Sequence, residues 1–521
     1  MIPEIILIHP PVVKCSEPPA GIARLSACLT ENGIAHKMID ANLEGILYLL
    51  KNESSKNTST DRWTARARKN LGLNLAAQRD ISTYRNQSRY QKSVMDINRL
   101  LNVAGKGLDI DLSLSDYQDK NLSPARSADL ISAAEKPHIN PFYSYFRHRL
   151  EDVLQRNPDF IGFSLNYLSQ ALCAFAIIGF IKKIHPRQKI ILGGSLMTSW
   201  VKLGATQTTF GGLADEIVEG PGEQKLLDIL KAKSRLSISR PDYNSFPLDQ
   251  YLSPGRVIPY SGAHGCYWHQ CAFCPEKAEG NAYRPLDISQ VTNDLKILTH
   301  QMQPALIHIL DSSISPSLLK ALAQNPPGAP WYGFARITTH LADEDFCSSL
   351  KQSGCVMLKL GIESGDQNVL DEINKGIDLS ITSQVLKNLK KAGIATYGYF
   401  LFGTPPENQE SALKTMDFVA GHHTCIDFLN LAIFNLPSGS VEAQNLATRD
   451  FYKGDLSLYK NFQHPLGWHR PAVRKFLEKI FKKHPAIAPI VKRTPEFFTS
   501  NHAPFFILQR RYGRDSLTIG R

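Results

Sequence analysis

The alternation of short apolar strands with helical patterns constrains the fold of this chain more than any other feature. Over roughly the first 235 residues, each apolar run is followed by a segment of helical periodicity, which is typical of a doubly wound parallel sheet. The predicted strands cover residues 4–9, 35–40, 160–165, 189–192 and 216–219. The predicted helices cover residues 20–31, 169–183 and 223–231. We therefore expect a Rossmann-like α/β domain over residues 1–238.

A long polar stretch interrupts this alternation between about residues 48 and 146. Loops of this length are usually functional or disordered, so we interpret the stretch as a helical insertion. Residues 51–106 contain twelve Lys and Arg against four Asp and Glu, and the whole chain has a net charge of +11. A basic surface can attract nucleic acid, anionic lipid or an acidic substrate, whereas a solvated helical face is the simpler interpretation. No nucleic-acid recognition motif accompanies the charge, so nucleic acid is not expected as a partner.

A second alternating block follows a Pro-rich linker over residues 239–256. Its predicted strands lie near residues 257–261, 306–310, 331–335, 356–361, 396–402 and 428–434, and helical segments such as 289–301 and 381–392 separate them. Six strand–helix repeats predict a partial (β/α)6 TIM-like barrel over residues 257–440, with its active site at the carboxyl ends of the strands. A small helical region over residues 441–521 would complete the chain. It includes an amphipathic helix over 472–483, with Phe476, Ile480 and Phe481 on one side.

Three cysteines follow the first strand of this second block. Cys266 and Cys271 are separated by four residues, and Cys271 and Cys274 by two. Three thiolates in one loop leave an iron–sulfur cluster with one iron free to bind another ligand. The alternative is a structural zinc site, which closes its sphere with four protein ligands and would need His264 or His269 as the fourth.

The composition favours a reducing compartment and argues against a membrane span. Nine cysteines, an odd number, are scattered over 521 residues with no secretory signal, so we expect a cytoplasmic protein. The longest apolar run, over residues 171–181, is shorter than the roughly 20 residues that a spanning helix needs. Hydrophobic content of 43% and charged content of 21% are ordinary for a globular protein.

The cysteine loop resembles the motif of the radical S-adenosylmethionine (radical SAM) superfamily. The usual pattern in that superfamily is C-x3-C-x2-C with an aromatic residue before the last Cys, here Phe273, and the first gap is one residue longer in this chain. The N-terminal half is similar to the cobalamin-binding domain found upstream of many radical SAM domains. The D-x-H-x-x-G motif of classical cobalamin proteins is absent, so a bound corrinoid would lack that lower His ligand.

Residues that follow the strands carry this resemblance further. In the first block they are the glycines Gly193, Gly194, Gly220 and Gly222, which the resemblance assigns to cobalamin. In the second block they are Asp311, Ser312, Arg336, Glu363 and Gly403, which the resemblance assigns to SAM. Taken singly, Arg336 or Glu363 suits a salt-bridged scaffold and Asp311-Ser312 suits a helix cap. Their occurrence in order, one set per strand end, favours a binding site.

The resemblance implies a 4Fe-4S cluster held by Cys266, Cys271 and Cys274 that cleaves SAM to a 5′-deoxyadenosyl radical. With cobalamin present, the implied outcome is C-methylation of a substrate that the sequence does not define, and the implied reducing partner is a flavodoxin or ferredoxin. Two alternatives stay open. One is a corrinoid-free radical SAM enzyme performing isomerisation, cleavage or sulfur insertion, and the other is a basic metal-bearing RNA-binding protein.

Overall fold

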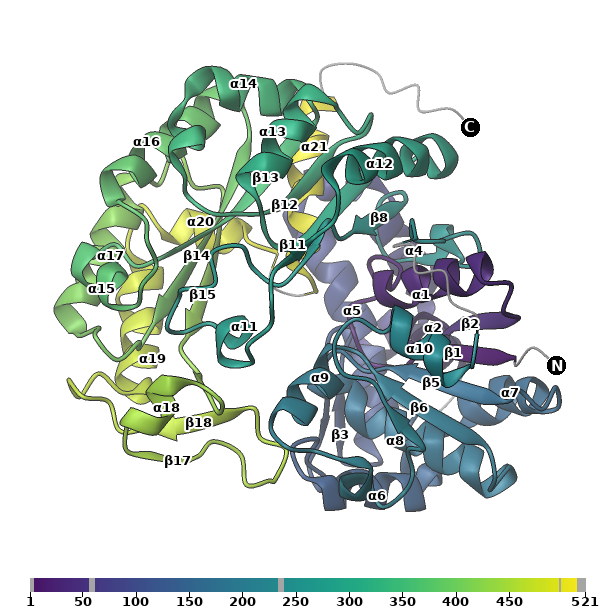
Figure 1. Ribbon diagram of the computed structural model, residues 1–521. Coiled ribbons are helices and arrows are strands. Elements are labelled where there is room, and N and C mark those ends of the chain that lie inside the picture. The colour runs from purple at the N-terminus through teal and green to yellow at the C-terminus, as the bar shows by residue number, and fades with distance from the viewer. Residues whose placement is uncertain (1–3, 56–60, 233–238, 496–497, 513–521) are drawn as a thin grey trace. The chain divides into compact units, whose positions relative to one another are not determined.

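The chain folds into two compact units (Figure 1). The computed structural model describes residues 4–55, 61–232, 239–495 and 498–512, so the predicted regions at residues 1–3, 56–60, 233–238, 496–497 and 513–521 lie outside the described residues. The first unit contains residues 1–254 with two short C-terminal segments, and the second contains the remainder. The C-terminal region, expected as a single segment, is thus divided between the two units.

The first unit is built on a five-stranded parallel sheet with the order β2-β1-β5-β6-β7. Its strands are β1 (Ile5–His9), β2 (His36–Asp40), β5 (Phe160–Ser164), β6 (Lys189–Gly193) and β7 (Glu216–Ile217). Its flanking helices are α1 (Ala20–Glu31), α8 (Leu168–Ile184), α9 (Ser195–Lys202) and α10 (Glu223–Ile229). In a sheet of this order, ligands bind beyond the carboxyl ends of the strands near the switch point, here between β1 and β5.

The insertion between β2 and β5 is mainly helical. It comprises α2 (Ala41–Ser54), α3 (Arg62–Lys69), α4 (Leu71–Arg79), α5 (Gln87–Lys106), the hairpin of β3 (Ile110–Leu112) and β4 (Tyr117–Asp119), α6 (Ser127–Glu135) and α7 (Tyr143–Leu154). Helix α8 is buried along most of its length because α6 packs against it. At their crossing, Gly179 lies so close to Ala134 that a Cβ on Gly179 would be 1.8 Å from the Ala134 carbonyl oxygen.

The second unit is built on a six-stranded parallel sheet in sequential order, β8-β11-β12-β13-β14-β15. Its strands are β8 (Val257–Tyr260), β11 (Leu306–Ile314), β12 (Trp331–Ala335), β13 (Cys355–Glu363), β14 (Ala395–Phe402) and β15 (Phe428–Ile433). The helices that follow them include α12 (Ile288–Met302), α13 (Pro316–Gln324), α14 (Glu344–Gln352), α15 (Gln367–Glu372), α16 (Leu379–Ala392) and α17 (Gln409–Gly421). These strands and those of the first unit confirm the predicted α/β fold with parallel sheets.

Short elements complete the chain after β15. They are β16 (Leu436–Pro437), α18 (Val441–Asn445), β17 (Thr448–Asp450), β18 (Tyr459–Phe462), α19 (Arg470–Lys479), α20 (Ala488–Arg493) and α21 (Ala503–Tyr512). The predicted helix over residues 472–483 is interrupted, since α19 ends at Lys479 and a 3-10 turn covers Phe481–Lys483. Ile480 lies at the break and is 42% exposed, so its predicted place on one side with Phe476 and Phe481 was wrong, since both of those residues are buried.

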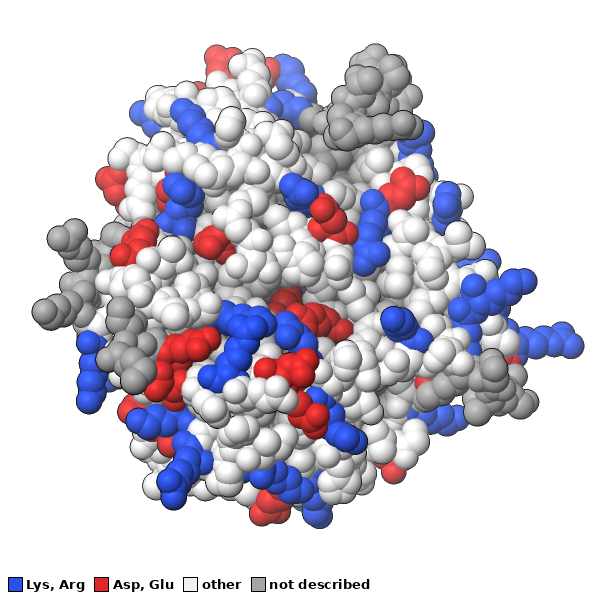
Figure 2. Space-filling model, turned by 90° about the vertical axis from the view of Figure 1, so that its right-hand side faces the viewer, with Lys and Arg blue, Asp and Glu red and all other residues white. Residues whose placement is uncertain are grey.

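The basic stretch of the insertion is partly neutralised by acidic partners. Arg68 pairs with buried Glu53, Arg66 with buried Asp96, and Arg99 with Asp61. On the face drawn in Figure 2, Lys and Arg side chains are interspersed with Asp and Glu side chains. These pairings show that part of the positive charge of the stretch is used within the insertion itself.

None of the helices within the described ranges combines the length and the apolar character that a bilayer span requires.

Candidate functional site

The three cysteines lie on a loop whose two ends are held together directly after β8. The loop leaves β9 (Ala263–His264) and returns through β10 (Arg284–Pro285), and these two segments form an antiparallel pair. Gly265 opens the loop with φ of +71°, and a Cβ there would lie 2.7 Å from the Ala282 carbonyl oxygen. Glycine is therefore the residue that lets the two ends of the loop approach each other.

A second loop, over residues 373–376, fastens the cysteine loop from the side. The Ala272 N–H donates to the Ile373 carbonyl at 2.9 Å, and the Trp268 indole N–H donates to the Asn374 carbonyl at 3.1 Å. Gly376 faces the Trp268 ring so closely that a Cβ would lie 2.1 Å from it. The position of the cysteines thus depends on the loop that follows β13 and α15 in the chain.

Two cations lie beside the cysteines. Arg336, directly after β12, donates to Cys271 Sγ at 3.8 Å and to the Lys375 carbonyl, and it stacks on the Trp268 ring with 4.2 Å from its guanidinium carbon to the ring centre. Lys375 Nζ lies 5.6 Å from the centre of the Phe273 ring. Burial raises the pKa of Cys271, while Lys375 and Arg336 act in the opposite direction. The positive charge suits a negatively charged sulfur centre.

The remaining sulfur positions have different surroundings. Cys271 is buried, whereas Cys266 and Cys274 are half-buried. Burial raises the pKa of Cys274 to about 11, against the effect of the Lys277 and Glu276 backbone N–H groups. On the same loop, the Nδ1 atom of His269 is buried and has no hydrogen-bond partner among the described residues. The loop therefore offers two half-buried thiols and, beside them, a buried ring nitrogen without a hydrogen-bond partner among the described residues.

The side chains of the described residues include no group of three or more His, Cys, Asp or Glu placed to hold one metal ion. The alternative arrangement, three cysteines with His264 or His269 around a single zinc, is therefore not formed in that part of the chain. A cluster distributes its cysteine ligands over different iron atoms, so it does not need the sulfurs to converge on one ion.

Asp311 and Ser312 differ in placement from the prediction. They were expected beyond the end of the second strand, but β11 continues to Ile314 and both residues lie inside it, where its register against β12 shifts. Asp311 is buried and its carboxylate accepts from the Gly262 N–H at 2.6 Å and the Ala263 N–H at 3.3 Å. In this structure Asp311 anchors the entry to the cysteine loop.

Glu363 and Gly403 end their strands as predicted. Glu363 is the last residue of β13, has a positive φ of 67° and pairs with Lys375 Nζ at 2.8 Å. Gly403 follows β14 with φ of +79°, and its N–H donates to the carboxylate of Glu407. The Trp468 indole N–H donates to the same carboxylate at 2.8 Å. Arg336, Glu363 and Gly403 thus follow three consecutive strands of one parallel sheet.

Sequence reasoning missed the residues that hold these groups in place. Lys375 pairs with Glu363, Trp268 stacks on Arg336, and Glu407 fixes the turn at Gly403. The available signal was weak. Lys375, Gly376 and Trp268 lie in loops, and Glu407 lies four residues after Gly403 in a segment without a strand or helix pattern.

In the first unit, the predicted glycines follow neighbouring strands. Gly193 ends β6. Gly194 has a φ of 104°, and there is no space for a Cβ on it, because a Cβ would lie 2.3 Å from the Leu165 carbonyl oxygen. The Gly220 N–H donates to the Thr198 hydroxyl at 2.9 Å, which joins the loop after β7 to helix α9. Gly222 precedes α10. A Cβ on Gly220 would have no atom within 4 Å, so this edge offers open space beside backbone.

The ends of β1 and β2 are closed by buried polar groups. His9 and Asp40 are register partners, and both are buried. Asp40 accepts from the Tyr251 hydroxyl at 2.6 Å and from the Leu43 N–H, and burial lowers the pKa of His9. Open space lies instead at Gly220 after β7, so that part of the edge is better suited to a ligand.

The fold and the strand-end residues define a class: a two-unit α/β protein with a three-cysteine loop at the carboxyl edge of a six-stranded parallel sheet. Residues 260–419 match the family model of the radical SAM superfamily, and this range includes the three cysteines, Arg336, Glu363 and Gly403. Over this range the chain is similar to the radical SAM superfamily.

Two curated relatives are methyltransferases by name. The chain is 24% identical over 302 residues to an uncharacterised methyltransferase of Pyrococcus horikoshii, a match that covers 50% of this chain and 64% of the relative. It is 25% identical over 257 residues to bacteriochlorophyllide d C-12(1)-methyltransferase of Chlorobaculum tepidum, covering 44% of this chain and 54% of that protein. The matched region therefore spans less than two thirds of either relative.

The whole described fold has a counterpart among solved structures. It is similar to the cobalamin-dependent S-adenosylmethionine radical enzyme OxsB, with a TM-score of 0.54 and 13% identity over 99% of this chain and 62% of that chain. At this identity the likeness concerns the fold alone.

Proposed function

We propose that this protein is a radical SAM enzyme with a 4Fe-4S cluster and cobalamin, and that it transfers a methyl group to a carbon of its substrate. Three findings support the proposal. Residues 260–419 match the superfamily model, two relatives are named methyltransferases, and the fold is that of a cobalamin-dependent enzyme. The observation that carries it is the three-cysteine loop fastened at the strand ends by Asp311 and the loop over residues 373–376.

Cys266, Cys271 and Cys274 would hold the cluster. When bound, the cluster supplies the electron that cleaves the sulfonium of SAM, and cobalamin supplies a carrier for the methyl group. Arg336 would donate hydrogen bonds to the sulfur of Cys271 and so stabilise negative charge there. Lys375 would hold Glu363 in one orientation, so that its free carboxylate oxygen can accept from a ribose hydroxyl. Gly403, with its positive φ of 79°, would turn the chain after β14 so that backbone faces the adenine.

The glycines of the first unit would support the corrinoid. Gly194 and Gly220 lie at the carboxyl ends of β6 and β7, where ligands of doubly wound sheets bind. At Gly220 the space beside the backbone is open, which would leave room for part of a large planar ring, whereas Gly194 would let the loop after β6 pack against the Leu165 backbone. Electrons would come from a small one-electron protein donor such as a flavodoxin or ferredoxin.

The first experiment tests the radical SAM assignment. The protein is reconstituted anaerobically with iron and sulfide, and iron content and release of 5′-deoxyadenosine from SAM under reduction are measured. We expect Cys271→Ala to lose both, because one of three ligands is removed. Cys425→Ala, which removes a half-buried cysteine far from residue 271 in the sequence, is the matched control and should behave as wild type. Equal release of 5′-deoxyadenosine from both variants would contradict the assignment.

The second experiment tests methylation. SAM with a deuterated methyl group is supplied to the reduced protein with an extract of small molecules, and products are analysed by mass spectrometry. We expect a substrate-derived product three mass units heavier than with unlabelled SAM, and cobalt bound to the purified protein. The competing function is a corrinoid-free rearrangement, cleavage or sulfur insertion. It predicts 5′-deoxyadenosine without label in product and without cobalt.

A further inference from the structure

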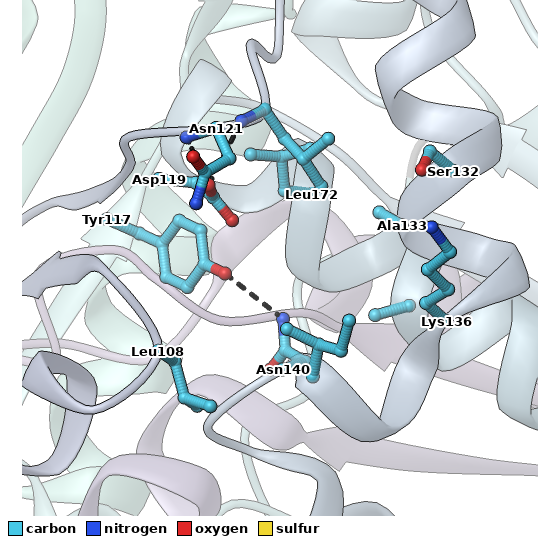
Figure 3. A pocket seen from close by; sticks show the side chains of 12 residues that line it. Leu108, Tyr117, Asp119, Asn121, Ser132, Ala133, Lys136, Asn140 and Leu172 are labelled. Carbon is cyan, nitrogen blue, oxygen red and sulfur yellow. Dashed lines mark hydrogen bonds between the residues drawn. The ribbon is translucent and has the colours of Figure 1, made fainter.

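A small pocket in the first unit does not define a ligand. It has a volume of about 190 Å³ and lies between the β3–β4 hairpin, α6 and α8 (Figure 3). Asp119 and Lys136 line it on opposite sides, and apolar residues such as Leu172 form the wall between them. Lys136 is exposed, so solvent screens its charge. A chemically more specific surface is the inner face of the sheet in the second unit.

Two aromatic rings lie on this inner face, next to the strand-end residues. Side chains two residues apart on a strand point to the same side, so Phe334 shares a face with Arg336. A Cβ on Gly361 would lie 2.5 Å from a carboxylate oxygen of Glu363, and Tyr399 is the register partner of Gly361. The ring centres of Phe334 and Tyr399 lie 4.9 Å apart, with 62° between the ring planes. We call these two rings the aromatic wall.

The aromatic wall is partly open although it lies on central strands. Strands of parallel sheets are usually covered on both faces. Helices α14 and α16 lie along the outer side of this sheet (Figure 1), where Ala335 and Phe400 are buried. On the inner face Phe334 and Tyr399 are only half-buried, and Leu310 of the neighbouring strand β11 is 36% exposed. Open apolar surface beside a cluster of charged groups is typical of a binding site.

The aromatic wall is supported from beneath and carries no charge. Lys359 of β13 is buried, its Nζ lies 5.1 Å from the centre of the Phe334 ring, and it donates to the Asn501 side-chain oxygen at 3.0 Å. Burial raises the pKa of Tyr399 to about 12, so its hydroxyl group stays neutral near pH 7. The surface that adjoins Arg336 and Glu363 is therefore fixed, aromatic and uncharged.

We propose that the aromatic wall receives a planar aromatic ring of the substrate. This inference rests on the radical SAM function proposed above, because the wall adjoins Arg336 and Glu363, the residues assigned to SAM. Aromatic rings pair in offset-stacked or edge-to-face arrangements, with a gain of about 0.5–1.5 kcal/mol beyond the burial of area. Phe334 and Tyr399 would supply such contacts to a planar ring. A saturated ring of the same size would gain only from burial.

Two probes with the same carbon skeleton separate ring pairing from burial alone. 2-Naphthol is planar, whereas decahydro-2-naphthol is saturated, puckered and more apolar. Their dissociation constants are measured by ligand-observed NMR on the anaerobically reconstituted full-length protein, with and without saturating S-adenosylhomocysteine. We expect 2-naphthol to bind about threefold more tightly or better, with and without S-adenosylhomocysteine. Equal affinity, tighter binding of the saturated alcohol, or no binding of 2-naphthol at about 1 mM would overturn the proposal.

Variants locate the binding of 2-naphthol. Phe334→Leu and Tyr399→Leu should each weaken it by about three- to tenfold and change the affinity for decahydro-2-naphthol by less than about twofold. Phe346→Leu, at a half-buried phenylalanine of the outer helix α14, is the control and should keep the preference of wild type. Melting temperatures verify folding, and either wall variant alone suffices for the test. An unchanged preference in a folded wall variant would overturn the proposal.

Competition and turnover separate this inference from its alternatives. If S-adenosylhomocysteine displaces 2-naphthol, the two rings belong to the SAM site and the proposal fails. Binding of the probes requires neither cleavage of SAM nor cobalamin. A preference for 2-naphthol that depends on Phe334 and Tyr399, without release of 5′-deoxyadenosine, would contradict the radical SAM function and leave the ring-binding site standing. Release of 5′-deoxyadenosine without that preference would contradict the aromatic wall alone.

Discussion

Glu407 is the buried carboxyl group that holds the turn after β14. Burial raises its pKa to about 7, while hydrogen bonds from the Gly403 N–H and Trp468 act in the opposite direction. Its second oxygen has no hydrogen-bond partner among the described residues. Between pH 4.5, the ordinary value, and pH 7 the folded protein keeps a proton that the unfolded chain has lost. The free energy of unfolding should therefore fall as the pH rises through this window, by about 3 kcal/mol in total.

Glu407→Gln should remove this pH dependence, because the amide oxygen still accepts from Gly403 and Trp468 but does not ionise. The unfolding midpoints of wild type and variant are measured at pH 5, 6, 7 and 8. The midpoint of wild type should fall relative to that of the variant as the pH rises. Glu410→Gln, at an exposed carboxylate of the following helix, supplies the baseline. A constant difference across all four pH values would contradict the assignment.

Gly376 sets the distance between the loop over residues 373–376 and the cysteine loop. Gly376→Ala would place a Cβ 2.1 Å from the Trp268 ring, which must then move away with the cysteines. We expect the variant to retain less than about half of the iron after reconstitution. Gly393→Ala has a similar φ of +73° but its nearest contact is 3.9 Å away, so it shares the backbone cost of about 1–2 kcal/mol without the collision. Equal iron content in the two variants would show that the Trp268 contact is unimportant.

The residues that follow the strands could be predicted from the sequence, whereas the residues that bind to them could not. Arg336 and Glu363 follow buried apolar runs, and parallel strands bring their carboxyl ends to one edge. Lys375 reaches Glu363 only because Asn374, with φ of 52°, turns the chain back. An asparagine just after the end of a helix often adopts this left-handed conformation, but helix α15, which ends before it, was not among the predicted helices. The ionic partner of Glu363 therefore had to come from the structure.

Helices α6 and α8 cross in close backbone contact at Gly179. Gly179→Ala should force the two helices apart and lower the free energy of unfolding by about 3 kcal/mol or more, because the obstacle is the Ala134 backbone. Gly72→Ala, in helix α4 with nothing within 4 Å, should instead stabilise by up to about 1 kcal/mol. Chemical unfolding of both variants measures the contrast. Two variants of equal stability would mean that the helices adjust freely.

Elements with strong patterns were predicted closely and marginal ones were missed. Helix α1 begins and ends where its apolar periodicity predicted, and the parallel strands agree within a few residues. The β3–β4 hairpin was missed because each strand has three residues, too few for a pattern of period two to emerge. The break at Ile480 was missed because periodicity continues through it to Phe481. Packing of that ring, rather than periodicity, decides where α19 ends.

For the whole molecule, the two cofactors should be separable because each would be held by a different unit. Cys271→Ala should lose iron and keep cobalt. Gly194→Ala should lose cobalt and keep iron, because its Cβ would lie 2.3 Å from the Leu165 carbonyl oxygen and displace the loop after β6. Elemental analysis of both purified variants, beside wild type, checks the pattern. Loss of both metals from both variants would contradict independent sites.

The chain returns to its first unit after building most of the second. Within that first unit, the Trp200 indole N–H donates to the Leu456 carbonyl at 3.1 Å, and the Leu456 N–H donates to the Ala125 carbonyl at 2.9 Å. A ribosome that has released residue 254 has therefore not yet supplied every partner that this core uses. The portion that is translated first can complete its hydrogen bonds only after about two hundred further residues have been synthesised, so its folding cannot finish during the early part of translation.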